Sequence, residues 1–294
     1  MNKIEVISNI KHPAIRQARA DLARIVGKWH DTYPVEGHGM LKQALAAGIR
    51  PRQVFFRDPA DGDDAQSMVD ELRSLDIPCY RVMPGVFSRI MALGYETSVG
   101  LLATVQPGQL GLEDLEQLHD ERAIVLVGER IQDPRNVGVL IRNADVWGAR
   151  LAIFGDSADA YSRAGVRSTT GSLFRVPVMQ AHDLLPPVVR LKEMGFRIIG
   201  SSAAATTPLW NIPLAPPCVI IVGNESTGMS QVLRDQCDEL VKIPMYGGAH
   251  SINVTVAAGV LLYESRRGSH EPSRAHGEQE PYDGAIESSE ATDD

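Results

Sequence analysis

The sequence lacks the markers of membrane, secreted and disulfide-rich proteins. Of its 294 residues, 44% are hydrophobic and 22% are charged. No apolar run approaches the roughly 18 residues that a membrane span needs, and residues 1–10 lack the apolar core of a signal peptide. The three cysteines, Cys79, Cys218 and Cys237, form no CxxC pair. We therefore expect a cytoplasmic protein whose cysteines are reduced core residues.

Several active-site motifs are also missing. No GxGxxG loop follows an apolar strand and no GxxxxGK(S/T) loop occurs, so the usual dinucleotide and nucleoside triphosphate sites are absent. There is no GxSxG turn for a serine nucleophile, and the eight histidines contain no HExxH pair. The sequence therefore lacks the motifs that are typical of dehydrogenases, nucleoside triphosphatases and hydrolases. We also expect no metal site.

Charge is unevenly distributed along the chain. The formal net charge is -8, yet residues 265–294 alone hold eight acidic residues against three arginines. We expect residues 268–294 to form a disordered acidic tail. Residues 1–30, in contrast, form a basic arm or helix with only two acidic residues. This arm would contact RNA phosphates or would simply be the solvated face of an amphipathic helix. Its basic residues are Lys3, Lys11, Arg16, Arg19, Arg24 and Lys28.

Residues 31–106 alternate short apolar runs with helical patterns and indicate a small α/β domain. The predicted strands are 33–36, 53–56, 79–82 and 100–105, and the predicted helices are 38–47 and 66–75. Residues 107–122 carry a proline, two glycines and several acidic residues. They predict a linker that leads into an acidic helix.

Residues 123–267 predict a second domain built on a parallel sheet. Its strands are continuous apolar runs, which is typical of strands covered by helices on both faces. They are 123–128, 151–155, 196–200, 218–223 and 240–243, with helices expected at 137–147, 183–194 and 231–237. In such an α/β fold, ligands bind in the loops after the carboxyl ends of the strands.

Three loops of this second domain are rich in polar residues of defined type. Asn136 and Arg142 follow the first strand, Glu225 lies in a glycine-containing loop, and Ser251 and Asn253 precede an apolar helix. Each has a purely structural alternative. Asn136 and Ser251 are good helix caps, and Glu225 would complement a helix dipole.

Together, the loops resemble the three motifs of the SpoU (TrmH-like) group of RNA ribose 2'-O-methyltransferases in the SPOUT superfamily. The motifs are N-x-G-x-x-x-R, G-x-E-x-x-G and I-P-M…S-x-N-V-x-x-A, and the resemblance covers residues 123–264. Residues 35–49 and the opening segment are similar to the substrate-binding domain of rRNA-modifying members. The resemblance implies a deep C-terminal trefoil knot, S-adenosylmethionine as cofactor, and a homodimer with its active site at the subunit junction.

The resemblance also implies roles for individual residues. The catalytic candidates are Arg142, Asn136, Glu225, Ser251 and Asn253. The cofactor-binding candidates are Ser201, Gly223, Asn224, Glu225, Ile243, Pro244, Met245, Ile252, Asn253 and Val254. The RNA-binding candidates are Arg142, Arg167 and Arg163. Because a guanidinium stays protonated in proteins, we expect Arg142 to bind an RNA phosphate and stabilise the developing 2'-alkoxide rather than act as a base.

Two alternatives remain beside an rRNA 2'-O-methyltransferase. One is a tRNA 2'-O-methyltransferase of the same group, and the resemblance of the first domain favours rRNA over it. The other is a non-catalytic RNA-binding or ribosome-assembly factor with the same fold. The presence of Asn136, Arg142, Glu225, Ser251 and Asn253 favours the enzyme.

Overall fold

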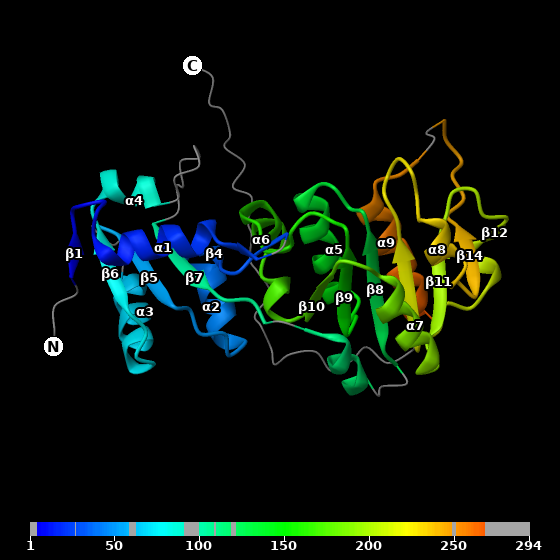
Figure 1. Cartoon of the computed structure of the whole chain (residues 1–294), viewed down its shortest axis with the longest axis horizontal. Helices are drawn as coiled ribbons and strands as arrows, with labels where there is room; N and C mark the ends of the chain where they lie inside the picture. Colours follow the sequence, from blue (N-terminus) through cyan, green and yellow to red (C-terminus); the bar gives the residue numbers. More distant parts are fainter. Residues whose placement is uncertain are drawn as a thin grey trace, which may run out of the picture.

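The computed structural model describes residues 5–26, 28–58, 63–90, 100–108, 110–118, 122–248 and 251–267. The predicted acidic tail, 268–294, lies outside these residues. Two larger sheets lie one after the other along the long axis of the molecule, the first from the N-terminal part of the chain and the second from the C-terminal part (Figure 1). None of the helices in the described ranges is long and apolar enough to cross a membrane.

The N-terminal unit contains a five-stranded mixed sheet. Strands β1, β6 and β5 are parallel, and β7 runs antiparallel to both β5 and β4. In sheet order the strands are β1 (Val6–Ile7), β6 (Cys79–Val82), β5 (Gln53–Arg57), β7 (Leu101–Val105) and β4 (Tyr33–Glu36). Strands β4 and β6 have the predicted bounds, and β5 and β7 differ from the prediction by one residue.

Helices cover both faces of this sheet because successive strand side chains point to opposite sides. Phe55 faces the helices α1 (Pro13–Ala23) and α4 (Pro84–Ile90). Phe56 lies in the cluster of α2 (His38–Ala46) and α3 (Asp63–Ser74). The predicted basic arm thus contributes α1 to this unit, where it buries Ile15 and leaves Arg16 and Arg19 exposed.

The C-terminal unit contains the predicted parallel sheet, with seven strands in the described residues. In sheet order they are β10 (Val178–Ala181), β9 (Leu151–Gly155), β8 (Ile124–Glu129), β13 (Cys218–Val222), β11 (Arg197–Ser201), β14 (Glu239–Lys242) and β12 (Thr207–Pro208). The five predicted strands are all present, with bounds that differ by at most one residue at either end. The edge strands β10 and β12 were not predicted.

Two helical layers enclose this sheet. The helices α5 (Pro134–Val146), α6 (Arg163–Thr169) and α9 (Val254–Arg267) pack on one face. The helices α7 (Leu185–Glu193) and α8 (Gln231–Arg234) pack on the other, beside the 3-10 turn η1 (Leu112–Gln117). The acidic helix expected after the linker is therefore this short turn. The sheet is buried on both faces, as continuous apolar strands require.

The cysteines are unpaired, and all three lie at least partly inside the protein. Burial raises the pKa of the Cys218 thiol to about 12 and those of Cys79 and Cys237 to about 11. At neutral pH these thiols stay protonated, and a protonated thiol is a poor nucleophile.

A small hairpin connects the two units. It consists of β2 (Ile25–Val26) and β3 (Trp29–His30). The Asp159 Oδ2 atom accepts a hydrogen bond from the His30 backbone N–H at 2.7 Å and lies 2.5 Å from His30 Nδ1. The Trp29 ring packs against His182 with centroids 4.6 Å apart. These contacts hold the N-terminal unit against the loops after β9 and β10.

Arg163 belongs to the same interface, although the sequence suggested that it contacts RNA. Its Nε and Nη2 atoms donate to the Glu36 carboxylate at 2.5 and 3.0 Å. The side chains of Arg163 and Glu36 are only 15% and 6% exposed. A guanidinium held in this way is not free to bind a phosphate, so Arg163 is a structural contact between the units.

We predict that Glu36→Gln destabilises the protein, because it removes the carboxylate that pairs with Arg163 in a largely buried site. The loss should be about 3 kcal/mol, which lowers the thermal midpoint by roughly 6 to 12 °C in calorimetry. The control is Glu116→Gln. It removes one of the two carboxylate partners of Arg190, in a pair whose side chains are 41% and 48% exposed, and it should change stability by at most about 1 kcal/mol. Equal effects of the two variants would contradict this role of Arg163.

Candidate active site

The site lies where the order of strands reverses. The chain passes from β8 to β9 and β10, then returns to β11 on the other side of β8, with β13 inserted between β8 and β11. Val222 at the end of β13 is opposite Gly128 in β8. The loops that follow these two strands therefore start side by side, at the position where open parallel sheets bind ligands.

Three of the predicted catalytic residues meet in this region. Asn136 Nδ2 donates to Glu225 Oε1 at 2.7 Å, and Asn253 Nδ2 donates to Asn136 Oδ1 at 3.4 Å. The partners of Asn136 are 89 and 117 positions away in the sequence. The amide of Asn136 thus links the three motif segments, which come from α5, the loop after β13 and the start of α9.

Asn136 is not the N-cap residue of a helix. The N-cap of α5 is Asp133, whose Oδ1 accepts the Arg135 N–H at 2.8 Å. The Arg135 side chain also hydrogen-bonds the Asp133 carboxylate and lowers its pKa. Asn136 lies in the first turn of α5, and its amide is free to reach across the site.

Ser251 does not cap the last helix either. Asn253 Oδ1 accepts the Thr255 N–H at 2.7 Å, and the Asn253 carbonyl accepts the Ala257 N–H at 3.0 Å. Asn253 therefore caps α9 and also contacts Asn136, while Ser251 is exposed at the start of its described segment.

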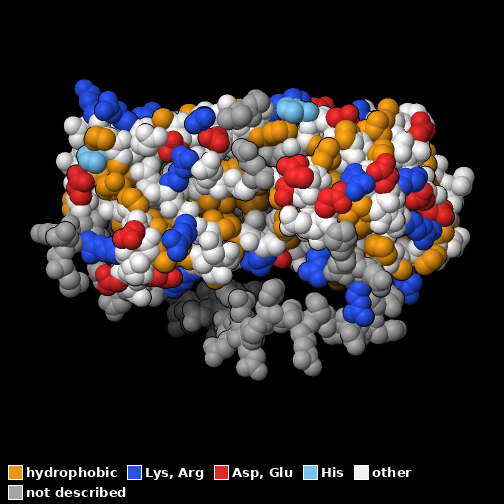
Figure 2. Space-filling view, turned by 60° about the horizontal axis from the view of Figure 1, so that its bottom comes forward, with side chains coloured by type: hydrophobic (Ala, Val, Ile, Leu, Met, Phe, Trp, Pro, Cys, Tyr) orange, Lys and Arg blue, Asp and Glu red, His pale blue; other side chains and the backbone are white. Residues whose placement is uncertain are grey.

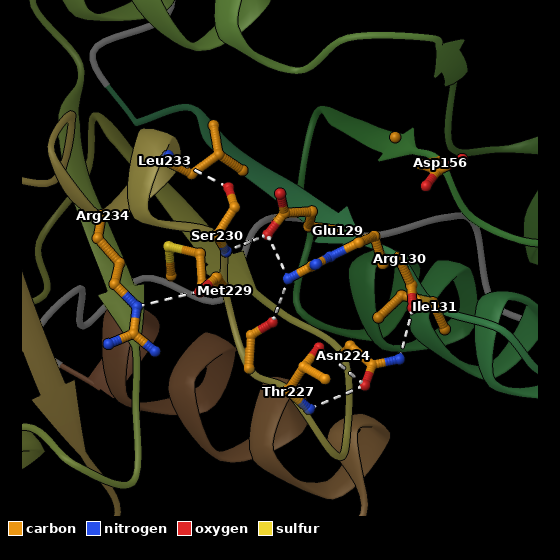
Figure 3. Close-up of polar contacts among 12 residues, drawn as sticks. Glu129, Arg130, Ile131, Asp156, Asn224, Thr227, Met229, Ser230, Leu233 and Arg234 are labelled. Carbon is orange, nitrogen blue, oxygen red and sulfur yellow. Dashed lines mark hydrogen bonds and ion pairs between the residues drawn. The ribbon is translucent and has the colours of Figure 1, made fainter.

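The loop after β13 is held by its own backbone and by Asn224. The Asn224 Oδ1 atom accepts the Ser226 N–H at 2.9 Å. The same atom accepts the Thr227 N–H at 3.0 Å (Figure 3). A Cβ atom on Gly223 would lie 2.4 Å from Met229 N. The glycine expected to let a cofactor approach is thus already required by the turn of the loop itself.

The remaining cofactor-binding candidates follow neighbouring strands. Ser201 ends β11, and residues 243–245 follow β14, which pairs with β11. Met245 is 39% exposed. Val254 differs, because its side chain is 5% exposed and packs in the core, which leaves only its backbone for a ligand. Ile243, Pro244 and Ile252 are partly exposed.

Arg142 and Arg167 face solvent on the adjacent helices α5 and α6. Arg142 is six residues beyond Asn136, which is about 9 Å along a helix axis. Within the described residues, neither arginine side chain makes a hydrogen bond or an ion pair. Both cations are available to a ligand, but the structure does not join Arg142 to the Asn136 group.

The sequence analysis missed Glu129 and Arg130. Glu129 ends β8 and is 9% exposed, and its Oε2 atom accepts the Ser230 N–H at 2.7 Å. Arg130 has a left-handed backbone with φ +54° and donates from Nη2 to the Gly228 carbonyl at 3.0 Å. The signal that could have found them is the pair of charged residues directly after the apolar run 123–128.

The glycine of the first motif has a packing role. A Cβ atom on Gly138 would lie 2.4 Å from the Gly165 carbonyl oxygen and 2.6 Å from Ser168 Cβ. The helices α5 and α6 therefore approach each other closely at Gly138. This contact fixes α5, and with it the position of Asn136. Among the described residues, no group of three His, Cys, Asp or Glu side chains could hold a metal ion.

Comparison with known proteins gives consistent similarities. Residues 123–263 match the family described as the SpoU rRNA Methylase family. A Bacillus subtilis protein named 23S rRNA (guanosine(2553)-2'-O)-methyltransferase RlmP is 30% identical over 238 residues, which are 80% of this chain and 89% of that protein. A Mycobacterium avium protein, named an uncharacterized tRNA/rRNA methyltransferase, is 29% identical over 87% of this chain and 84% of its own length.

Solved structures share the fold over most of this chain. An AdoMet-bound rRNA methyltransferase from Sinorhizobium meliloti has a TM-score of 0.78 at 23% identity, with 90% of this chain and 98% of that chain covered. The SpoU methyltransferase AviRb from Streptomyces viridochromogenes has a TM-score of 0.74 at 25% identity, with 87% and 97% covered. The predicted fold class, an α/β fold with a parallel sheet, is confirmed.

We predict opposite effects for two glycine-to-alanine variants. Gly138→Ala forces α5 and α6 apart and should destabilise the protein by about 1 to 3 kcal/mol. Gly39→Ala, where nothing lies within 4 Å of the new Cβ atom, should stabilise α2 by about 0.5 kcal/mol. Urea denaturation measures both, and a neutral Gly138→Ala would show that the helices do not need this contact.

Proposed function

Because this chain belongs to the SpoU rRNA methylase family, we propose that it transfers a methyl group from S-adenosylmethionine to a ribose 2'-hydroxyl of RNA. The family is a group of methyltransferases. The observation that carries the proposal is the convergence of Asn136, Glu225 and Asn253 at the switch point of the sheet. A site at this position, built from three separate loops, fits a small cofactor placed beside a larger substrate.

The proposed substrate is large-subunit rRNA, and the proposed location is the cytoplasm. The similarity to the Bacillus subtilis enzyme covers 89% of that protein and 80% of this chain, so it includes at least part of the N-terminal unit. In this unit α1 presents Arg16 and Arg19 to solvent, and such cations bind RNA phosphates. In the face seen in Figure 2, a small group of Lys and Arg side chains lies at the upper left corner, over the N-terminal unit, and other basic side chains are spread among acidic ones across the face. The similarity to the Bacillus subtilis 23S rRNA enzyme favours rRNA over tRNA, and the cations would suit either RNA.

The cofactor would supply an electrophilic methyl group on a cationic sulfur. Residues 200–202, 223–225, 243–245 and 251–254 would hold it through their backbone groups. They fit this role, because they lie at one edge of the sheet and include the exposed apolar side chain of Met245. The Glu225 carboxylate, oriented by Asn136, adds a negative charge that favours a cationic ligand.

Arg142 is the proposed catalytic cation. It stays charged, lies exposed on α5 and has no ion-pair partner within the described residues. It would bind a phosphate of the RNA and stabilise the negative charge that develops on the 2'-oxygen. Arg167 on the neighbouring α6 would provide a second phosphate contact. The rest of the rate enhancement would come from aligning the hydroxyl oxygen with the methyl carbon.

We also propose that the enzyme is a homodimer that associates through α5 and α9. Val146 on α5 is 61% exposed, and Val256 and Tyr263 on α9 are 54% and 49% exposed. These two helices pack side by side, and their exposed apolar side chains would be the centre of the contact between subunits. Arg142 lies four residues before Val146, one turn away on the same helix face. Association through this patch would bring Arg142 to the subunit junction. The trefoil knot stays a prediction.

The reaction itself distinguishes the three candidate functions. We expect the purified protein to bind S-adenosylmethionine and to transfer labelled methyl groups to rRNA from a strain that lacks the modification. Transfer to tRNA alone would identify a tRNA enzyme. No detectable binding of the cofactor in calorimetry would favour a non-catalytic assembly factor.

We predict that Arg142→Ala abolishes methyl transfer and leaves the affinity for S-adenosylmethionine within about threefold, because the side chain acts on the RNA and not on the cofactor. Filter-based methyl incorporation and calorimetry measure the two quantities. The control is Arg135→Ala on the same helix, whose side chain is paired with Asp133 and which should keep most of the activity. An active Arg142→Ala enzyme would refute the assigned role.

We predict that Val256→Glu converts the dimer into a monomer, because it buries charges at the centre of the proposed apolar interface. Light scattering coupled to gel filtration measures the mass. The control is Val232→Glu, at a valine that is also 54% exposed but lies on α8. A dimer that persists in Val256→Glu would place the interface elsewhere.

A further inference from the structure

The loops after β8 and β13 exchange three hydrogen bonds. Arg130 Nη2 donates to the Gly228 carbonyl at 3.0 Å, and Asn224 Nδ2 donates to the Arg130 carbonyl at 2.9 Å. The Ser230 N–H donates to Glu129 Oε2 at 2.7 Å. Figure 3 shows Glu129 and Arg130 between the two ends of the 223–230 loop. Both ends of that loop are thereby tied to residues 129 and 130.

We propose that Arg130 is a positioning residue, which fixes the 223–230 loop in the conformation that binds S-adenosylmethionine. The inference rests on the proposed function, because it assigns that loop to the cofactor. Arg130 would not contact the reacting atoms. It would act through the loop that carries Glu225.

The backbone of Arg130 supports this role. Its φ angle of +54° lies in the left-handed region, which is unfavourable for a residue with a side chain. In this conformation the same residue receives a hydrogen bond at its carbonyl and gives one from its guanidinium. A strained backbone persists when the surrounding contacts hold it, and here those contacts come from the 223–230 loop.

The side chain supports the same conclusion. Arg130 Nε is buried and has no hydrogen-bond partner in the described part of the chain, which is unfavourable for the side chain by itself. Arg130 Nη2 lies 3.8 Å from Glu129 Oε2, and the Glu129 side chain is only 12% exposed. The guanidinium therefore stays where it bonds the loop, and the Glu129 carboxylate keeps its own hydrogen bond from the Ser230 N–H.

Arg130 would affect the candidate site by fixing the part of the loop that carries Glu225. Glu225 lies between Asn224 and Gly228, the two points at which Arg130 is bonded to the loop, and its carboxylate accepts from Asn136. Residues 225–227 between these points are exposed. Without the guanidinium, the Gly228 end would lose its partner. The loop would then sample conformations that do not bind the cofactor, and the measured affinity would fall.

Arg130→Gly separates the side chain from the turn, because glycine adopts a positive φ without strain. We expect this variant to bind S-adenosylmethionine about tenfold more weakly in calorimetry, with a thermal midpoint within about 2 °C of the wild type. Backbone amides of residues 225–228 should exchange faster with deuterium in the absence of ligand. Arg130→Lys, which keeps one charged donor, should recover part of the affinity. Arg135→Ala should bind within about twofold of the wild type.

The outcomes are distinguishable. A wild-type protein that does not bind S-adenosylmethionine would overturn the proposed function itself. A wild type that binds, together with an Arg130→Gly variant of equal affinity or unchanged exchange at 225–228, would overturn only the role of Arg130. An affinity loss that appears only with a large fall in the thermal midpoint, and that Arg130→Lys does not reduce, would also overturn it.

Discussion

The insertion of β13 between β8 and β11 is the constraint on which the candidate site depends. In this parallel register Val222 lies opposite Gly128, so the chain leaves two adjacent strands at the same height. The loops that follow are distant in sequence but start as neighbours. Short side chains, such as those of Asn136 and Asn224, are then long enough to form hydrogen bonds with the neighbouring loop. Parallel strand order thus brings three separate motifs together at one edge of the sheet.

A second constraint fixes the N-terminal unit relative to this region. The hairpin that carries His30 and the buried pair of Glu36 with Arg163 both attach it to loops or helices of the parallel-sheet unit. Because the α5 and α6 helices that carry Arg142 and Arg167 belong to the same packed assembly, RNA bound by the first unit would meet these arginines in a defined geometry. Packing between the two units, rather than a flexible linker, would then position the bound RNA relative to the catalytic residues.

Sequence patterns predicted the features that depend on local periodicity and on residue type. The strand 151–155 was predicted with its observed bounds, because a buried parallel strand is a continuous apolar run. The resemblance assigned Asn136, Glu225, Asn253 and Arg142 to one site, and the structure joins the first three by hydrogen bonds but does not join Arg142 to them. The partner of Arg163 was not predicted, since Glu36 is 127 positions away and meets it only after the two units dock. The cap of α5 was misjudged, because Asp133 and Asn136 are both good caps and only the backbone decides between them.

The central claim is that loops at one edge of the parallel sheet form the binding site for S-adenosylmethionine. Hydrogen–deuterium exchange with and without the cofactor tests it most directly. The account predicts slower exchange in peptides that cover residues 200–202, 223–230, 243–245 and 251–254, with no change in the five-stranded sheet. A cofactor that binds while these peptides exchange at their original rate, or that protects the N-terminal unit instead, would contradict it.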